Sequence, residues 1–181
     1  MESALSSLII FAVGLYAAVT ISFTYLETQD SLWTVEQSRQ EEILQRERTR
    51  IDLVHAETQS DGSIIRVVVR NSGQMKLSDY ERWDVVVEYY AAGENEEDPN
   101  VYAVEWLPYA ASGLTELHWT ISGIYLDAAT LTPEAFEPGI FNPDEEMVIQ
   151  AQMAPSVAMT STNRMTISSI NGINDSIHII R

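Results

Sequence analysis

The chain has 181 residues, a formal net charge of −17 at pH 7 and no cysteine. This length allows one domain of ordinary size with an appendage, and the lack of cysteine excludes a disulfide framework or a thiolate metal site. The charge excludes nucleic acid as a partner, because phosphate binding needs clustered Lys and Arg, and Lys76 is the only lysine.

An uncharged and mostly apolar stretch, residues 3–26, begins the chain. As a helix its 24 positions would extend about 36 Å, more than the roughly 30 Å hydrocarbon core of a bilayer. A cleaved secretory signal is disfavoured, because the apolar run is long and no basic residue precedes it. A plain membrane anchor and a helix packed against its own copies both stay open. The i,i+4 pairs Ser3/Ser7 and Gly14/Ala18 would let two helices approach closely.

The stretch passes directly into a polar continuation, residues 27–50, which contains neither Pro nor Gly. Glu, Gln, Arg and Leu dominate its second half, and these residues favour helix. Joined to the apolar stretch, it would form one helix of about 70 Å. We therefore predict a helical domain, residues 1–50, and a separate head, residues 51–181.

The two predicted domains differ in charge. Residues 1–50 contain four arginines and seven acidic residues, a balance of −3, whereas residues 51–181 contain six basic and twenty acidic residues, a balance of −14. Such an acidic, lysine-poor head stays hydrated and mutually repulsive in saline surroundings.

From residue 51 the pattern changes to short β-branched and aromatic runs separated by turn residues. Asp61-Gly62 is a hairpin signal, and residues 130–144 contain three prolines and one glycine, which predicts an irregular excursion. Many short strands with regular turns predict an α+β fold in which the helix precedes an Ig-like antiparallel β-sandwich. The expected strands are residues 51–58, 64–70, 83–90, 101–107, 117–126, 146–153, 164–170 and 176–180.

The search for chemical motifs is negative. His55, His118 and His178 are far apart and none has a metal-ligand spacing, and the sequence contains no serine-hydrolase elbow, dinucleotide fingerprint or P-loop. Two acidic clusters could offer oxygen ligands to Ca²⁺, but they lack the EF-hand pattern, so solvated charge is the preferred interpretation. We expect no enzyme, no cofactor and no metal. The clusters are Glu94, Glu96, Glu97 and Asp98, and Asp144, Glu145 and Glu146.

One modification motif is present. Asn174-Asp-Ser176 is an N-x-S sequon, which makes Asn174 a candidate glycosylation site in an exposed head.

The arrangement of the whole chain resembles the type IV pilin superfamily, and within it the archaellins and archaeal-type pilins. The resemblance rests on the apolar helix, its polar continuation and the abrupt start of a β-rich head at Ile51. The run Val67-Val-Val-Arg-Asn-Ser-Gly73, followed by Leu77 and Trp83-Asp-Val-Val-Val87, is similar to a pattern of archaellin heads and of the archaellum's accessory stator proteins.

Two departures qualify the resemblance. Bacterial type IV pilins usually have Glu at the fifth mature position, and Leu5 here favours the archaeal branch if Met1 is the mature end. Members of the family are made with a short basic leader that is cleaved off. The resemblance therefore implies that this sequence is the processed form, with Met1 exposed after cleavage.

The resemblance implies a subunit that lies in the membrane before assembly and then polymerises with itself through the N-terminal helix into an extracellular helical filament. A prepilin peptidase and an assembly ATPase with its platform are the implied partners. The leading prediction is an archaellum or archaellum-like motility filament. The residues expected at helix-packing contacts are Ser3, Ser7, Leu8, Phe11, Gly14, Leu15, Ala18 and Ser22.

Two alternatives stay open at this point. An adhesive archaeal-type IV pilus would use the same helix and sandwich, because fold does not fix function. The other is a membrane-anchored, Ig-like stator or binding protein that does not polymerise and instead recruits an envelope partner.

Overall fold

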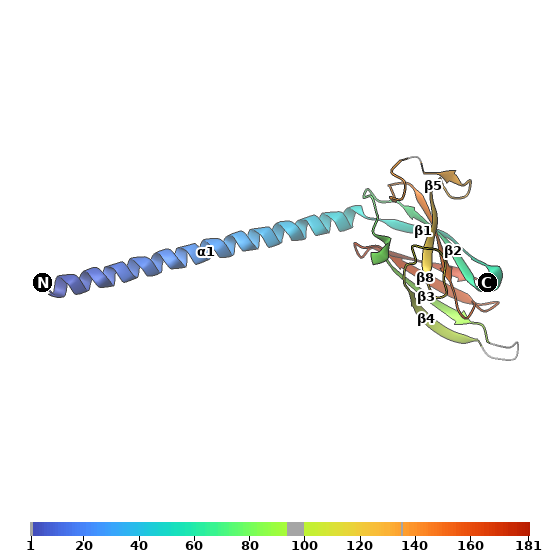
Figure 1. Cartoon of the computed structure of the whole chain (residues 1–181), viewed down its shortest axis with the longest axis horizontal. Coiled ribbons are helices and arrows are strands. Elements are labelled where there is room, and N and C mark those ends of the chain that lie inside the picture. Colours follow the sequence, from blue (N-terminus) through green and yellow to red (C-terminus); the bar gives the residue numbers. More distant parts are fainter. Residues whose placement is uncertain (1, 94–99, 135) are drawn as a thin grey trace. The chain divides into compact units, whose positions relative to one another are not determined.

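The computed structural model describes the backbone of residues 2–93, 100–134 and 136–181 (Figure 1). Within the helix, side chains are described for residues 9–25, 29, 33, 35–37, 39–41 and 43–48. The chain divides into two compact units, Met1–Leu44 and Gln45–Arg181.

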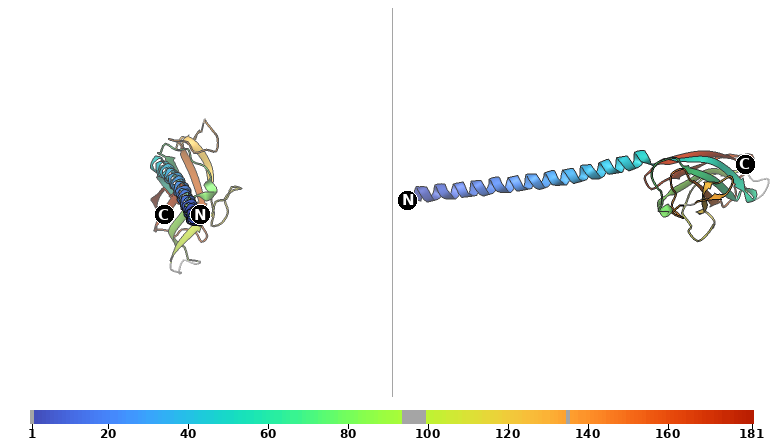
Figure 2. Two further views of the ribbon diagram at one scale, coloured as in Figure 1. Left: turned by 90° about the vertical axis from the view of Figure 1, so that its left-hand side faces the viewer. Right: turned by 90° about the horizontal axis from the view of Figure 1, so that it is seen from above.

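The first element, α1 (Glu2–Arg48), is one continuous helix in the views of Figure 2. The structure does not bear out the bilayer-length apolar helix that the sequence predicts at residues 3–26. Among the residues that it describes, no helix combines the length and the apolarity that crossing a membrane requires. The apolar side chains that can be assessed without interruption are those of residues 9–25.

The second unit is a sandwich of two antiparallel sheets, as the strand pattern predicts. The five-stranded sheet has the order β1-β2-β7-β5-β6, and the four-stranded sheet has the order β4-β3-β8-β9. The strands are β1 (Ile51–Gln59), β2 (Ile64–Asn71), β3 (Asp84–Ala91), β4 (Val101–Leu107), β5 (Trp119–Asp127), β6 (Thr132–Pro133), β7 (Glu146–Gln152), β8 (Thr162–Ser168) and β9 (Asn174–Ile180).

Alternate residues of the central strands point between the sheets and form the core. In β2 and β3 these include Val67, Val69, Val85 and Val87, all fully buried. Trp83 packs near Phe141, with ring centroids 6.5 Å apart, at one end of this core. Because one face of each strand fills the core, the outward faces hold the side chains that are available for function.

The predicted strands agree with the structure within two residues at each shared boundary, and β4 has the predicted bounds. The turn after β1 contains Asp61 and Gly62 with φ of 54° and 78°, which fits the hairpin signal. Sequence reasoning missed β6 (Thr132–Pro133), a two-residue strand inside the predicted irregular excursion.

Candidate functional site

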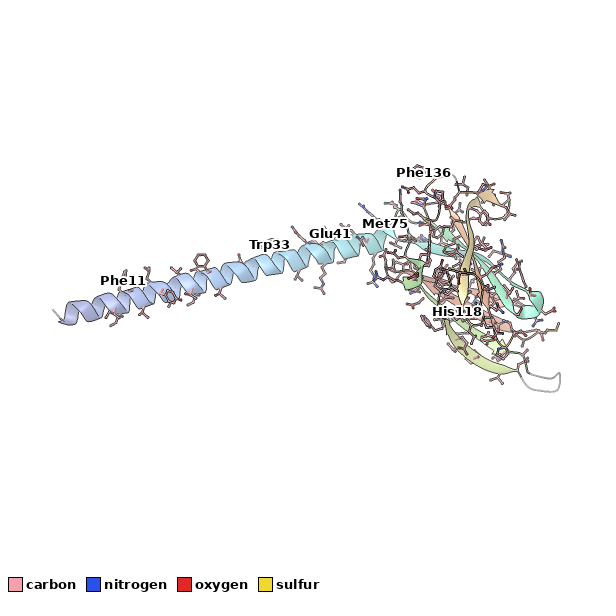
Figure 3. The ribbon with its side chains drawn as sticks, in the orientation of Figure 1. Phe11, Trp33, Glu41, Met75, His118 and Phe136 are labelled. Carbon is pink, nitrogen blue, oxygen red and sulfur yellow. The ribbon has the colours of Figure 1, made fainter. Side chains whose placement is uncertain are left out.

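Residues 9–25 of α1 present exposed side chains all round in the single chain. Phe11 is 72% exposed and Leu15 is 58% exposed, and apart from its chain neighbours and the local helix backbone no atom lies within 4 Å of a Cβ built on Gly14. Ala18 and Ser22, also expected at helix contacts, are exposed as well. Figure 3 shows Phe11 projecting from the helix. This surface therefore has room for a covering that the single chain does not supply.

The side chains of Ser3, Ser7 and Leu8, which complete the expected packing set, lie outside the described residues. Whether any of the eight residues contacts another copy stays a prediction.

Hydroxyl side chains in this segment donate to the helix backbone. The Oγ1 of Thr20 lies 2.9 Å from the carbonyl oxygen of Tyr16, and the Oγ of Ser22 lies 2.8 Å from that of Ala18. Such bonds satisfy a hydroxyl without water. Residues 9–25 thus combine an apolar surface with internally bonded hydroxyls, which suits apolar surroundings.

The last helical turn belongs to the hydrogen-bond network of the sandwich. Thr49 is buried, and its Oγ1 donates to the carbonyl oxygen of Gln45 at 2.7 Å. The side-chain amide of Asn171 donates to the same Oγ1 at 2.8 Å, while the Nε of Arg46 donates to the carbonyl oxygen of Asn171 at 3.0 Å. The turn between β8 and β9 therefore holds the end of α1.

The Asn-Ser-Gly turn after β2 holds the same end from another side. Asn71 is fully buried, and its amide donates to the carbonyl oxygens of Met75 and Phe141 at 2.8 and 2.9 Å. The backbone N–H of Gly73 donates to the carbonyl oxygen of Arg50 at 3.1 Å. A Cβ at Gly73 would lie 2.6 Å from the carbonyl oxygen of Arg48. The motif on which the family resemblance rests thus has a structural role at the junction.

We call these contacts, between residues 45–50 and the turns at residues 71–75 and 169–173, the junction. Figure 3 labels Met75 in this region. Its bonds link backbone and amide groups and contain no arrangement of nucleophile and base. The junction can position the helix end, but it offers no chemistry of its own.

A second candidate site is the outward surface of β3 and β4, which we call the aromatic face. Antiparallel pairing places Val86 opposite Trp106 and Tyr90 opposite Tyr102. Trp106 is 58% exposed and Tyr102 is 53% exposed, and the rings of Tyr90 and Tyr102 meet edge to face at 5.5 Å. The residues of the face are Val86, Tyr90, Tyr102, Val104 and Trp106.

Carboxylates fix two of the three aromatic side chains of this face, those of Trp106 and Tyr102. The Nε1 of Trp106 donates to Asp84 at 3.0 Å, and the hydroxyl of Tyr102 donates to Glu88 at 3.0 Å. Glu88 also accepts from the Nε of Arg164 at 3.1 Å. The hydrogen bonds from Arg164 and then from Tyr102 hold the pKa of Glu88 below its ordinary value. The exposed rings are therefore held in place before any partner arrives.

The outward surface of the five-stranded sheet has covered apolar side chains at its centre. Val68 and Val148 are buried there beneath Ala128, from the turn after β5, and Tyr125 packs against the same cluster. A hollow of about 370 Å³ beside them is lined mainly by polar and small side chains, among them His55, Arg66 and Glu146. This surface has no exposed aromatic face comparable with that of β3 and β4 among its described residues.

No group of three or more His, Asp or Glu side chains suited to hold a metal occurs among the described residues. His55 lies 3.6 Å from Glu57, His118 contacts the carbonyl oxygen of Glu116 at 2.7 Å, and His178 is exposed on β9.

The acidic clusters have different outcomes. Glu94, Glu96, Glu97 and Asp98 lie outside the described residues. The interpretation of the second cluster as solvated charge is wrong for Glu145, which is 3% exposed and accepts from the backbone N–H of Asn142 at 2.8 Å. A carboxylate that binds a turn backbone in this way needs no ion pair to be satisfied.

Asn174, the predicted glycan acceptor, is exposed at the first residue of β9. Its modification stays a prediction. Sequence reasoning missed the aromatic face, although a signal existed. In Val101-Tyr-Ala-Val-Glu-Trp-Leu107 the apolar residues occupy both alternations, so a strand with one buried face must leave some of them outside.

No protein-family model matches the chain, and no curated protein matches it. Among solved structures, the chain is similar to an archaellum periplasmic stator protein, FlaG, from Sulfolobus acidocaldarius. The identity is 14%, the TM-score is 0.49, and the match covers 72% of this chain and 98% of that chain. A complex of FlaF and FlaG from the same organism matches with 14% identity and a TM-score of 0.48, covering 72% of this chain and 88% of that chain.

Proposed function

We propose that the chain is an archaellum-associated binding protein of the stator type. In this proposal an Ig-like sandwich binds a partner outside the cytoplasm. The apolar segment of α1 attaches the protein to the cell envelope, and the chain does not polymerise. The term stator is taken from the sequence resemblance and from the stator proteins above. The support for a binding function comes from the side chains of this chain.

The aromatic face carries the proposal. Trp106 and Tyr102 are exposed and held in place by carboxylates, and interface cores are enriched in such aromatic side chains. The head has a balance of −14, so identical heads repel one another. A preformed aromatic surface on a self-repelling head supports binding to a different protein better than close packing against copies of itself.

The second candidate is the filament subunit that the sequence resemblance implies, either of an archaellum or of an adhesive pilus. Its specific support is the apolar surface of residues 9–25, which is exposed all round in the single chain and would be covered in a bundle of helices. This candidate also needs the implied peptidase and assembly ATPase. Both candidates use the helix, and they differ in what the heads contact.

The experiment that separates them is fractionation of sheared archaeal cells that express the full chain. We expect the protein to stay with the envelope as discrete complexes, and the sheared filaments to lack it as their main protein. The matched variant is Gly14→Leu, at a position with open space around it. Wild-type recovery of the variant with the envelope supports the stator type. Filaments built from the chain, with a lower yield in Gly14→Leu, would establish the filament subunit.

A further inference from the structure

Among the described residues, strand β4 forms a sheet edge that has little of the usual protection. It is the terminal strand of the four-stranded sheet, runs from Val101 to Leu107, and carries Glu105 as its one charged residue, with no Lys and no Pro. Natural proteins protect long edges with lysines, prolines, bulges, covering segments or inward-pointing charges, and of these β4 has only Glu105, which lies opposite the buried Val87. An edge with so little protection invites another strand to pair with it. Figure 1 shows β4 at the margin of the sandwich.

The other sheet edges are protected. Strand β6 has two residues and covers only the end of β5, but β5 itself is bulged between Ile121 and Gly123. Strand β1 is bulged between Leu53 and His55. The edges formed by β1 and β9 also meet across the sandwich, where the backbone N–H of Leu53 donates to Asp175 at 2.8 Å. Among the described strands, β4 is thus the long edge that stays open.

The strands next to this edge carry net negative charge. Asp84 and Glu88 lie on the same side of the sheet as the aromatic face, Glu105 lies opposite the buried Val87 on the other side, and neither strand contains a basic residue. Arg164 of β8 is already paired with Glu88. Guanidinium and ammonium groups are attracted to both carboxylates and aromatic rings. The exposed rings of Trp106 and Tyr102 therefore lie in a setting that suits cations.

We propose that the edge of β4 and the aromatic face bind an extended segment of another protein that carries Arg or Lys at alternate positions. The segment pairs with the backbone of β4, and its basic side chains lie over Tyr102 and Trp106. A second copy of this chain is disfavoured as occupant, because its β3 and β4 would bring the same carboxylates to the contact. This inference rests on the proposed binding function and adds the class of the partner.

The test uses the full chain in mild detergent and a labelled, capped heptapeptide that alternates Arg and Val. Its counterpart alternates Glu and Val. We expect the basic peptide to bind at least about tenfold more tightly than the acidic one, with weaker binding at high salt. Hydrogen exchange at the amides of residues 101–106 should slow when the basic peptide binds.

Two variants locate the site. Trp106→Ala removes the main ring, and Val104→Lys adds a positive charge to the outward side of the edge; each should weaken binding by about tenfold. Trp33→Ala is the matched control, because Trp33 is also an exposed tryptophan but lies on α1, and its removal should leave binding unchanged. Circular dichroism checks that each variant is folded.

Equal affinity for the two peptides, binding unchanged in both β4 variants, or slowed exchange confined to another strand would each overturn the proposal. So would a concentration-dependent dimer of the free chain that Trp106→Ala dissociates, because this would identify a second copy as the occupant. If the chain does not bind the peptide but fractionates with the envelope as discrete complexes, this inference is wrong and the proposed function stands. If the chain binds the peptide but is found in sheared filaments, the proposed function is wrong and the peptide site stands.

Discussion

The outward surfaces of the two sheets both carry apolar side chains, but those at the centre of the five-stranded sheet are covered and the aromatic ones on the four-stranded sheet are exposed. On the five-stranded sheet Val148 is 2% exposed because Ala128 covers it, whereas on the four-stranded sheet Tyr102 and Trp106 are more than half exposed. The chain thus uses one of its own turns to bury the first set. Burial contributes stability in the first case, while the second set keeps its apolar area available for a partner.

The largest expected difference between the surfaces comes from one substitution made on each. Val148→Asp places a carboxylate in a covered site and should lower the free energy of unfolding by about 3 to 5 kcal/mol. Val104→Asp, on the open face, should cost about 1 kcal/mol, the span of strand propensities. Urea unfolding of the full chain, followed by tryptophan fluorescence, measures both. Similar losses for the two variants would mean that the aromatic face is covered in the protein.

Two glycines extend the contrast between covered and open positions. A Cβ at Gly73 would lie 2.5 Å from the backbone nitrogen of Arg50, so Gly73→Ala must displace the junction and should cost about 2 kcal/mol. Gly14→Ala meets open space and should raise helix stability by about 1 kcal/mol. Thermal unfolding gives the first value, and helix content by circular dichroism gives the second. A neutral Gly73→Ala would show that the turn is not held against the helix end.

A third substitution tests the packing of Tyr125 over the outward surface of the five-stranded sheet. A Cβ at Gly123 would lie 2.5 Å from the hydroxyl oxygen of Tyr125, whose side chain packs on the Val68 and Val148 cluster. Gly123→Ala should therefore push this ring aside and cost about 1 kcal/mol. In a Tyr125→Ala background the same change should be close to neutral, which a double-mutant cycle measures. A full cost in that background would place the strain in the backbone instead.

The sequence predicted much of the fold but little of this contrast. Alternation and turn residues placed the strands, because these signals are local, and the Asn71-Ser-Gly73 motif was noticed before its contacts were known. Whether an outward valine is covered depends on a distant turn. Val148 and Val104 are alike in sequence, yet Ala128 reaches one of them and no described residue buries the other. Glu145 was misjudged for a different reason, since its partner Asn142 is near in sequence but is brought to it only by the fold of the loop.

The smallest expected effect concerns the pH dependence of the open face. Hydrogen bonds from Arg164 and from Tyr102 lower the pKa of Glu88 in the folded chain, and the hydrogen bond to Glu88 raises the pKa of Tyr102. A carboxyl with a lowered folded pKa stabilises the fold at pH values above its unfolded pKa. This contribution is lost as pH falls through the folded value, in the acidic range below the ordinary pKa of Glu.

Glu88→Gln should therefore reduce the loss of stability on acidification and leave the stability near neutral pH slightly lower. Arg164→Met should move the pKa of Glu88 back toward its ordinary value, because it removes the larger of the two causes. Carboxyl chemical shifts followed by NMR during an acid titration measure this directly. Glu57 on β1 is the internal reference, since the hydrogen bond from Gln59 lowers its pKa independently of Arg164. If the Glu88 titration did not change in Arg164→Met, the carboxylates would not hold the aromatic face as described.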